Sequence, residues 1–138
     1  NSRLDPLQAA VLRVKLAALD GWNARRRALA GRYAEGLAGV PGLTLPAASG
    51  ADHVHHLHVV RAERRDALQA ALRERGVDAQ VHYPIPPHRS GVYGHLRLEL
   101  PLAERLAGEV LTLPIGPHLA PADADAVVEA VRDLAAVP

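Results

Sequence analysis

The first third of the chain carries one continuous helical pattern. Its apolar residues recur at steps of three and four positions, which places them on one side of an α-helix. They are Leu7, Val11, Val14, Ala18 and Trp22. Asp5 followed by Pro6 is typical of a helix start, because Asp caps free amides and Pro suits the first turn. The pattern predicts one helix from there to about residue 37, with Gly21 as the place for a bend and 39–42 as its end.

This predicted helix is long for a chain of 138 residues. A helix of about 30 residues spans roughly 45 Å, which exceeds what the core of so small a domain needs. We therefore expect residues 1–39 to form an interface helix that reaches a partner, and residues 40–138 to form a small α/β domain.

The rest of the chain alternates between strand-like and helix-like segments. Strands are predicted at 53–60, 77–83 and 110–115, and helices at 65–75, 102–109 and 121–136. This order predicts about three strands, mostly antiparallel, with helices on one face of the sheet and the long helix before it.

The composition supports an α/β fold and excludes several functions. The apolar residues are nearly all Ala, Leu and Val, without Phe or Met, which favours helix-rich packing over an aromatic-rich β-sandwich. A net charge of +1 gives no sign of nucleic acid or an anionic membrane as a partner. The absence of cysteine excludes disulfides and a thiolate nucleophile.

Two features bear on the cellular setting of the protein. No apolar run approaches the ~20 residues of a membrane helix and no signal sequence opens the chain, so we expect a cytoplasmic protein. The chain opens without Met in the phrase NSRLDP, so we expect it to be a fragment of a longer protein.

The eight histidines are the first candidates for chemistry. In a strand, His53 and His55 would lie on one face and His56 and His58 on the other, with about 7 Å between the members of each pair. Zinc sites need three or four ligands, and no nearby acidic residue has a spacing that completes one. We therefore expect no metal site, and we expect these histidines to pack and hydrogen-bond within the fold.

Two more histidines lie in the proline-rich stretch HYPIPPH, residues 82–88. Its prolines fix the backbone and leave the side chains of His82, Tyr83 and His88 little freedom. Rigid loops at strand ends often carry function. From the residues alone, the stretch fits a structural turn and the wall of a binding site equally well.

The sequence contains no GxGxxG, Walker A or GxSxG motif, which leaves dinucleotide, phosphate-loop and serine-hydrolase functions without support. One place for an anion remains at the start of the chain. Asn1, Ser2 and Arg3 come just before a helix N-terminus, where backbone amides and the helix dipole favour a phosphate.

Four phrases follow one another along nearly the whole chain: NSRLDPLQAA, HHLHVVR, VHYPIPPH and LPLAERLAGEVLTLPIGPH. Together they resemble the C-terminal part of the DegT/StrS-type sugar aminotransferases. The resemblance implies the small C-terminal domain of a fold-type I (aspartate aminotransferase-like) enzyme that uses pyridoxal 5′-phosphate. It also implies transfer of an amino group from an amino acid, with glutamate as the expected donor, to a keto-sugar carried by a nucleotide.

The resemblance implies roles for individual residues. Asn1 would reach across a homodimer interface to the cofactor phosphate of the neighbouring subunit, and Arg3 would lie near the same shared site. His82, Tyr83 and His88 would contact the nucleotide-sugar substrate.

One departure from the family pattern limits what this chain can do. The family's Schiff-base lysine, its cofactor-stacking aromatic residue and the acidic partner of the pyridine nitrogen belong to a larger N-terminal domain. The single lysine here, Lys15, matches a non-catalytic helical stretch. The resemblance therefore implies no catalytic residue in this chain, no activity of the chain alone, and a cofactor bound mainly by the N-terminal domain.

Two other interpretations remain open from the sequence. Some relatives in the same family use the cofactor to dehydrate a sugar, with histidine in place of the lysine, and the position that decides between the two is not in this chain. The chain could also be a free-standing binding or dimerisation module with the long first helix as its interface.

Overall fold

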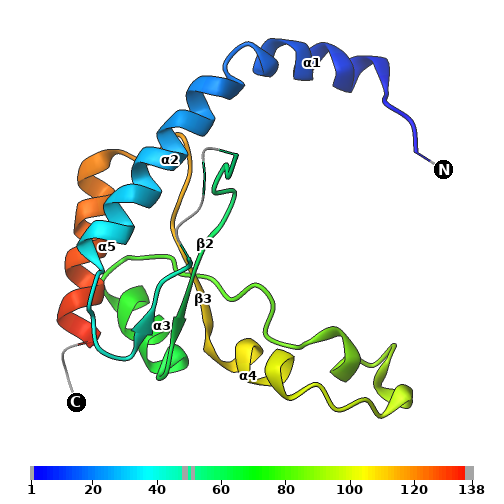
Figure 1. Cartoon of the computed structure of the whole chain (residues 1–138). Coiled ribbons are helices and arrows are strands. Elements are labelled where there is room, and N and C mark those ends of the chain that lie inside the picture. The colour runs from blue at the N-terminus through cyan, green and yellow to red at the C-terminus, as the bar shows by residue number, and fades with distance from the viewer. Residues whose placement is uncertain (1, 48–49, 51, 136–138) are drawn as a thin grey trace.

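The computed structural model describes residues 2–47, 50 and 52–135. The elements in chain order are α1 (Pro6–Leu16), α2 (Leu19–Gly36), β1 (Leu43–Thr44), β2 (His58–Ala62), α3 (Arg65–Glu74), η1 (Pro87–Arg89), η2 (Gly94–Leu96), α4 (Pro101–Glu109), β3 (Val110–Leu113) and α5 (Pro121–Ala135). Helix α1 runs away from the body of the molecule, whereas α2, α3 and α5 gather around the sheet (Figure 1).

The sheet has three antiparallel strands in the order β1-β2-β3. Strand β2 alternates in burial: His58, Val60 and Ala62 are buried, and the residues between them are half-buried. This period of two gives the sheet one face toward the core and one face open to its surroundings. The expected small α/β domain, with about three mostly antiparallel strands, is confirmed.

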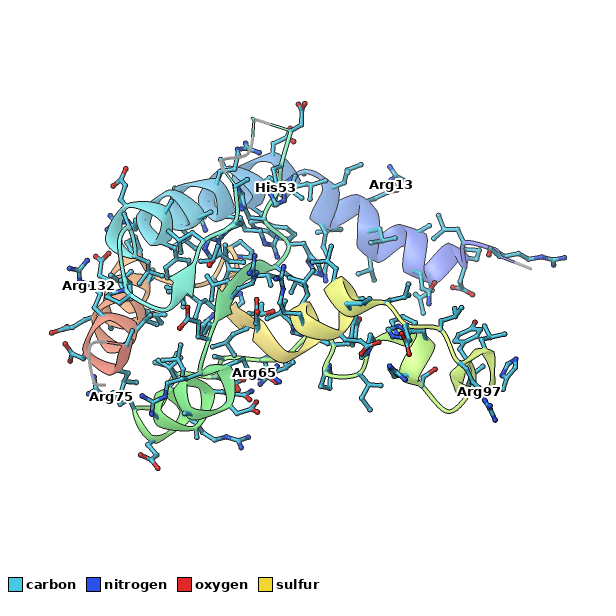
Figure 2. All side chains as sticks on the ribbon, turned by 60° about the horizontal axis from the view of Figure 1, so that its bottom comes forward. Arg13, His53, Arg65, Arg75, Arg97 and Arg132 are labelled. Carbon is cyan, nitrogen blue, oxygen red and sulfur yellow. The ribbon has the colours of Figure 1, made fainter. Side chains whose placement is uncertain are left out.

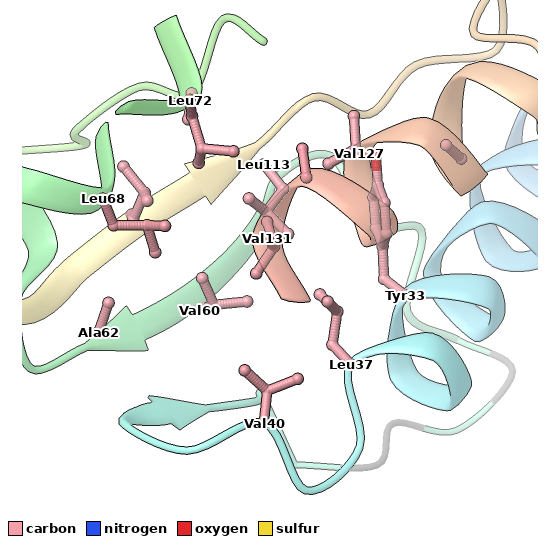
Figure 3. Packing of buried hydrophobic residues seen from close by; sticks show 14 of the residues in the cluster. Tyr33, Leu37, Val40, Val60, Ala62, Leu68, Leu72, Leu113, Val127 and Val131 are labelled. Carbon is pink, nitrogen blue, oxygen red and sulfur yellow. The ribbon is translucent and has the colours of Figure 1, made fainter. Parts of the chain in front are cut away.

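One hydrophobic core joins the inner face of the sheet to α2, α3 and α5 (Figure 3). Its largest fully buried side chains come from every one of these elements: Tyr33, Leu37, Leu72, Leu111, Leu113, Val60 and Val131. Burial of each large aliphatic side chain contributes roughly 1.5–3 kcal/mol relative to leaving it exposed. The core therefore holds α2 firmly against the sheet, while α1 contributes no buried residue.

The prediction of one helix through residue 37 is wrong in one respect. The helix is interrupted at Ala17 and Ala18, where Ala18 N–H bonds to the carbonyl of Lys15, three residues back, and a new helix starts at Leu19. The break lies before Gly21, which is inside α2. It lets α2 pack along α5 while α1 continues in another direction (Figure 1).

Two strand predictions also need correction. The segment 53–57 is not strand, because His55 adopts a left-handed conformation with φ of 48° that interrupts an extended chain, so β2 starts only at His58. The segment 77–83 forms only a single bridge, from Gln80 to Thr112. Its expected alternation is present nevertheless, since Ala79 is buried and Gln80 is exposed. In addition, the two-residue strand β1 lies where a loop was predicted.

Candidate functional site

The proline-rich stretch leaves the sheet at its open edge. Gln80 and Thr112 of β3 exchange two backbone hydrogen bonds of 2.7 and 3.0 Å. Two residues later, Nδ1 of His82 lies 3.0 Å from Oγ1 of Thr112. Strand β3 therefore holds this segment by backbone and side chain before the chain runs out through η1 and η2 to α4 (Figure 1).

His82 and Tyr83 stand at the beginning of this excursion and are joined by a cis peptide bond. Their ring centroids are 5.8 Å apart and the ring planes meet at 89°. The side chain of Tyr83 is 78% exposed, so its phenol is available to another molecule. His82 is exposed as well, but Thr112 fixes one of its ring nitrogens.

His88 is buried, in contrast to the two residues above, and it belongs to a charged cluster. Its Nε2 lies 2.9 Å from Oε1 of Glu104. The same oxygen accepts from Nη2 and Nε of Arg89, at 2.9 and 3.2 Å, and from the backbone N–H of Leu100, at 3.2 Å. These donors, with the His88 bond first in importance, lower the pKa of Glu104 to about 2.

A second histidine group lies between α2 and the start of β2. The ring centroids of His53 and His55 are 4.2 Å apart, those of His55 and His58 6.3 Å, and His58 stands 5.0 Å from Tyr33. His58 is buried, and neither of its ring nitrogens has a hydrogen-bond partner among the described residues. Burial, reinforced by His55 and His53, lowers the pKa of His58 to about 4. The expectation that these histidines hydrogen-bond within the fold is therefore wrong for His58.

At the start of the chain, Asn1 lies outside the described residues. Arg3 is exposed ahead of α1. The free amides of the helix start are occupied by the chain itself, because Oδ1 of Asp5 accepts from Leu7 N–H at 2.8 Å and from Gln8 N–H at 3.4 Å.

A Schiff-base lysine supplied by this chain would have to be Lys15, the only lysine of the sequence. Lys15 is exposed on α1, and it lines neither the hollow beside α3 nor the shallow one on α1 itself. A Schiff-base lysine must instead be directed into a pocket at the aldehyde carbon. For metals, the described part of the chain contains no group of three or more His, Cys, Asp or Glu that could hold an ion.

Two groups of exposed apolar residues lie on α1 and on the segment from 83 to 102. The first is on α1 and its flanks and consists of Leu4, Leu7, Val11, Leu12, Val14, Leu16 and Leu19. The second is on the segment from 83 to 102 and consists of Tyr83, Ile85, Val92, Tyr93, Leu96, Leu98, Leu100 and Leu102. Arg13 and Arg97 mark these two parts in Figure 2, on the side away from Arg75 and Arg132. Within the described part of the chain, no helix is both long and apolar enough to cross a membrane.

A hollow of about 510 Å³ lies elsewhere, between β1, α3 and the end of α5. Its lining is mainly apolar and includes Leu43, Ala62, Leu68 and Leu134. None of the predicted site residues lines it, so it is separate from the proline-rich stretch.

The fold and this sequence define a class of protein. The family model of the DegT/DnrJ/EryC1/StrS aminotransferases matches residues 1–132. The chain belongs to this family, and the expected resemblance is confirmed.

Individual relatives show how similar the chain is to known proteins. The chain is 55% identical to the dTDP-3-amino-3,4,6-trideoxy-alpha-D-glucose transaminase of Streptomyces venezuelae, over 98% of this chain and 37% of the relative. It is 54% identical to the erythromycin biosynthesis sensory transduction protein EryC1 of Saccharopolyspora erythraea, over 96% and 37%. The structure of S. venezuelae DesV in complex with a ketimine intermediate superimposes with a TM-score of 0.94 at 51% identity, over 100% of this chain and 38% of that one. The chain thus spans a little over a third of the length of these relatives.

Glu104 and Thr112, which bond to His88 and His82, were not among the residues predicted from the sequence; for Glu104 a local signal exists. Its signal was a Pro at the first helical position followed by a Glu in the first turn, which predicts capping but not the contacts with His88 and Arg89. Those contacts depend on how the loop folds back onto α4, and a local sequence pattern does not determine this.

Proposed function

We propose that this chain is the C-terminal part of a pyridoxal-phosphate-dependent aminotransferase that transfers an amino group from an amino acid, with glutamate as donor, to the keto group of a nucleotide-linked sugar. The observation that carries the proposal is the family match over residues 1–132, together with 55% identity to a named sugar transaminase. When bound, pyridoxal phosphate supplies the electron sink for such transfers.

The names of the relatives support a more specific substrate. Three of them are transaminases for dTDP-linked 3-amino sugars, at 55%, 44% and 44% identity. We therefore propose a dTDP-linked 3-keto deoxysugar as the acceptor, and deoxysugar biosynthesis as the setting. Glutamate is the proposed donor, as the family resemblance implies.

The part of this chain in that reaction is to form one wall of the substrate pocket. The phenol of Tyr83 is exposed beside His82. Both residues follow Gln80, which β3 binds through backbone hydrogen bonds. A phenol and an imidazole can donate to and accept from sugar hydroxyls or phosphate oxygens. His88 supports this wall from inside the fold, because its ring is buried against Glu104.

The remaining roles involve a second subunit and the rest of the protein. We propose a cytoplasmic homodimer in which residues 1–39 belong to the interface, and in which Asn1 and Arg3 approach the cofactor phosphate of the neighbouring subunit. The exposed apolar residues of α1 support an interface there. The main part of the cofactor site would then belong to a part of the protein outside this chain, since Lys15 cannot serve.

The test uses the longer protein that contains this chain. Glutamate and a dTDP-linked 3-keto sugar should yield 2-oxoglutarate and the amino sugar in equal amounts. Loss of the sugar hydroxyl as water, without nitrogen transfer, would overturn the proposal in favour of dehydration. For the phosphate contact, Asn1→Ala should weaken retention of the cofactor during dialysis, and the neighbouring Ser2→Ala should not.

A further inference from the structure

The loop 84–100 is held to the rest of the molecule in an unusual way. Its own hydrogen bonds are local turns, such as Ser90 Oγ to the carbonyl of Pro87 at 2.7 Å and His95 Nδ1 to the carbonyl of Val92 at 3.0 Å. Among the residues that the structure describes, each hydrogen bond that leaves this loop ends on Glu104.

The bonds to Glu104 close the loop from both of its ends. His88 and Arg89 lie near the beginning of the loop and Leu100 is its last residue, yet all three donate to Oε1 of Glu104. The backbone N–H of Glu104 also bonds to the carbonyl of Leu100 at 3.0 Å. One residue in the first turn of α4 therefore joins both ends of the loop to the helix.

The electrostatics make this junction stable at neutral pH. The donors keep the pKa of Glu104 far below neutrality, so the carboxylate is ionised and can only accept. Nε2 of His88 must then carry a hydrogen, which fixes the orientation of the buried ring. Bonds to an ionised acceptor are stronger than bonds between neutral groups.

We propose that Glu104 is a positioning residue: it acts through His88, Arg89 and Leu100 to hold the loop 84–100, and with it the exposed face that begins at Tyr83, in place for the nucleotide sugar. This inference rests on the proposed function. Glu104 acts through these groups, because the side-chain hydrogen bonds of its Oε1 all go to residues of the loop.

The test compares Glu104→Gln with Glu109→Gln in the longer protein. Glu109 is at the other end of α4 and pairs with Arg61 at 2.8 Å, so its substitution also removes an ion pair from the same helix. Glu104→Gln should raise KM for the nucleotide sugar about tenfold with kcat and the KM for glutamate within about twofold, since only the positioning of one substrate is lost. Glu109→Gln should leave the KM for the nucleotide sugar unchanged.

Hydrogen exchange of the loop amides, read on the same samples, separates the two proposals. Exchange in 84–100 should be faster in Glu104→Gln than in Glu109→Gln. If the unaltered protein transfers no amino group, the proposed function fails, and faster loop exchange would still support Glu104 as the anchor. If loop exchange and the KM for the sugar are both unchanged, the inference is overturned. Equal losses of kcat and melting temperature in the two variants would also overturn it.

Discussion

The imidazole of His58 packs 5.0 Å from the phenol ring of Tyr33, and neither of its nitrogens has a hydrogen-bond partner in the described part of the chain. A buried polar group without a partner is costly, and for an imidazole the cost is much greater for the charged form. This contact between α2 and β2 is therefore formed by a neutral ring.

The first prediction concerns the pH dependence of stability. The pKa of His58 is lowered to about 4 in the folded chain from 6.5. Between these values the unfolded chain binds the proton and the folded chain does not, so stability should fall as the pH drops from 6.5 to 4. The loss should reach about 3 kcal/mol below that window. Urea unfolding at a series of pH values measures it.

The matched variants for this prediction are His58→Phe and His56→Phe. His56 is exposed, and its substitution should leave the slope of stability against pH between 6.5 and 4 unchanged. His58→Phe should flatten most of that slope; a part should remain, because burial also lowers the pKa of His55. An unchanged slope in His58→Phe would contradict a neutral buried ring.

The second prediction concerns Tyr33, which packs against His58. The hydroxyl of Tyr33 donates to the carbonyl of Pro114 at 2.6 Å. Tyr33→Phe should destabilise the chain by about 1–2 kcal/mol, because the bond is lost and a carbonyl is left unpaired.

Burial raises the pKa of Tyr33 to about 12. Stability should therefore also decrease as the pH rises from 10 to 12, and Tyr33→Phe should remove this decrease. Tyr93→Phe, at an exposed position, is the control and should leave stability within about 0.5 kcal/mol.

The third prediction concerns the packing of α2 on α5. A methyl group at Gly36 would lie 2.6 Å from Cγ1 of Val128, closer than packed atoms allow. Gly36→Ala should therefore destabilise the chain by about 1–3 kcal/mol. Gly31→Ala is the matched control in the same helix, because no atom beyond the neighbouring residues and the helix's own backbone lies within 4 Å of the added methyl group. It should stabilise by about 0.5–1 kcal/mol through helix propensity. Equal effects in thermal unfolding would contradict this packing.

The helices that pack on the sheet could be predicted well from the sequence because local signals define them. The last helix was predicted at 121–136 and α5 is Pro121–Ala135, and the helix predicted at 65–75 is α3, Arg65–Glu74. Capping residues and a hydrophobic period of 3.6 involve only residues that are close in the sequence, so they can be identified without knowing the fold. The strands were harder to predict than the helices. The segment 77–83 could form a full strand only beside a partner of matching length, and β3 has only four residues.

The candidate site was predictable only in part, for a similar reason. The prolines around His82, Tyr83 and His88 mark a stiff segment in any fold, and the structure indeed places these residues on one irregular excursion. Which of them is exposed depends on the tertiary contacts of Glu104 and Thr112, which lie 16 and 30 positions away from their histidine partners. No pattern in neighbouring residues contains such pairs.

The last prediction concerns the apolar surface of α1. Leu7, Val11 and Val14 are exposed although they form one stripe at steps of four and three, and α1 has no buried residue. In the longer protein this stripe should be covered by the neighbouring subunit. Val11→Asp places a charge in it and should weaken the dimer at least tenfold, as seen by sedimentation at a series of concentrations. Arg13→Asp changes a residue off this stripe and should alter the dissociation constant by less than about threefold. If Val11→Asp leaves the dimer intact, this stripe does not form the interface, and the exposed residues of the segment from 83 to 102 would become the next surface to alter.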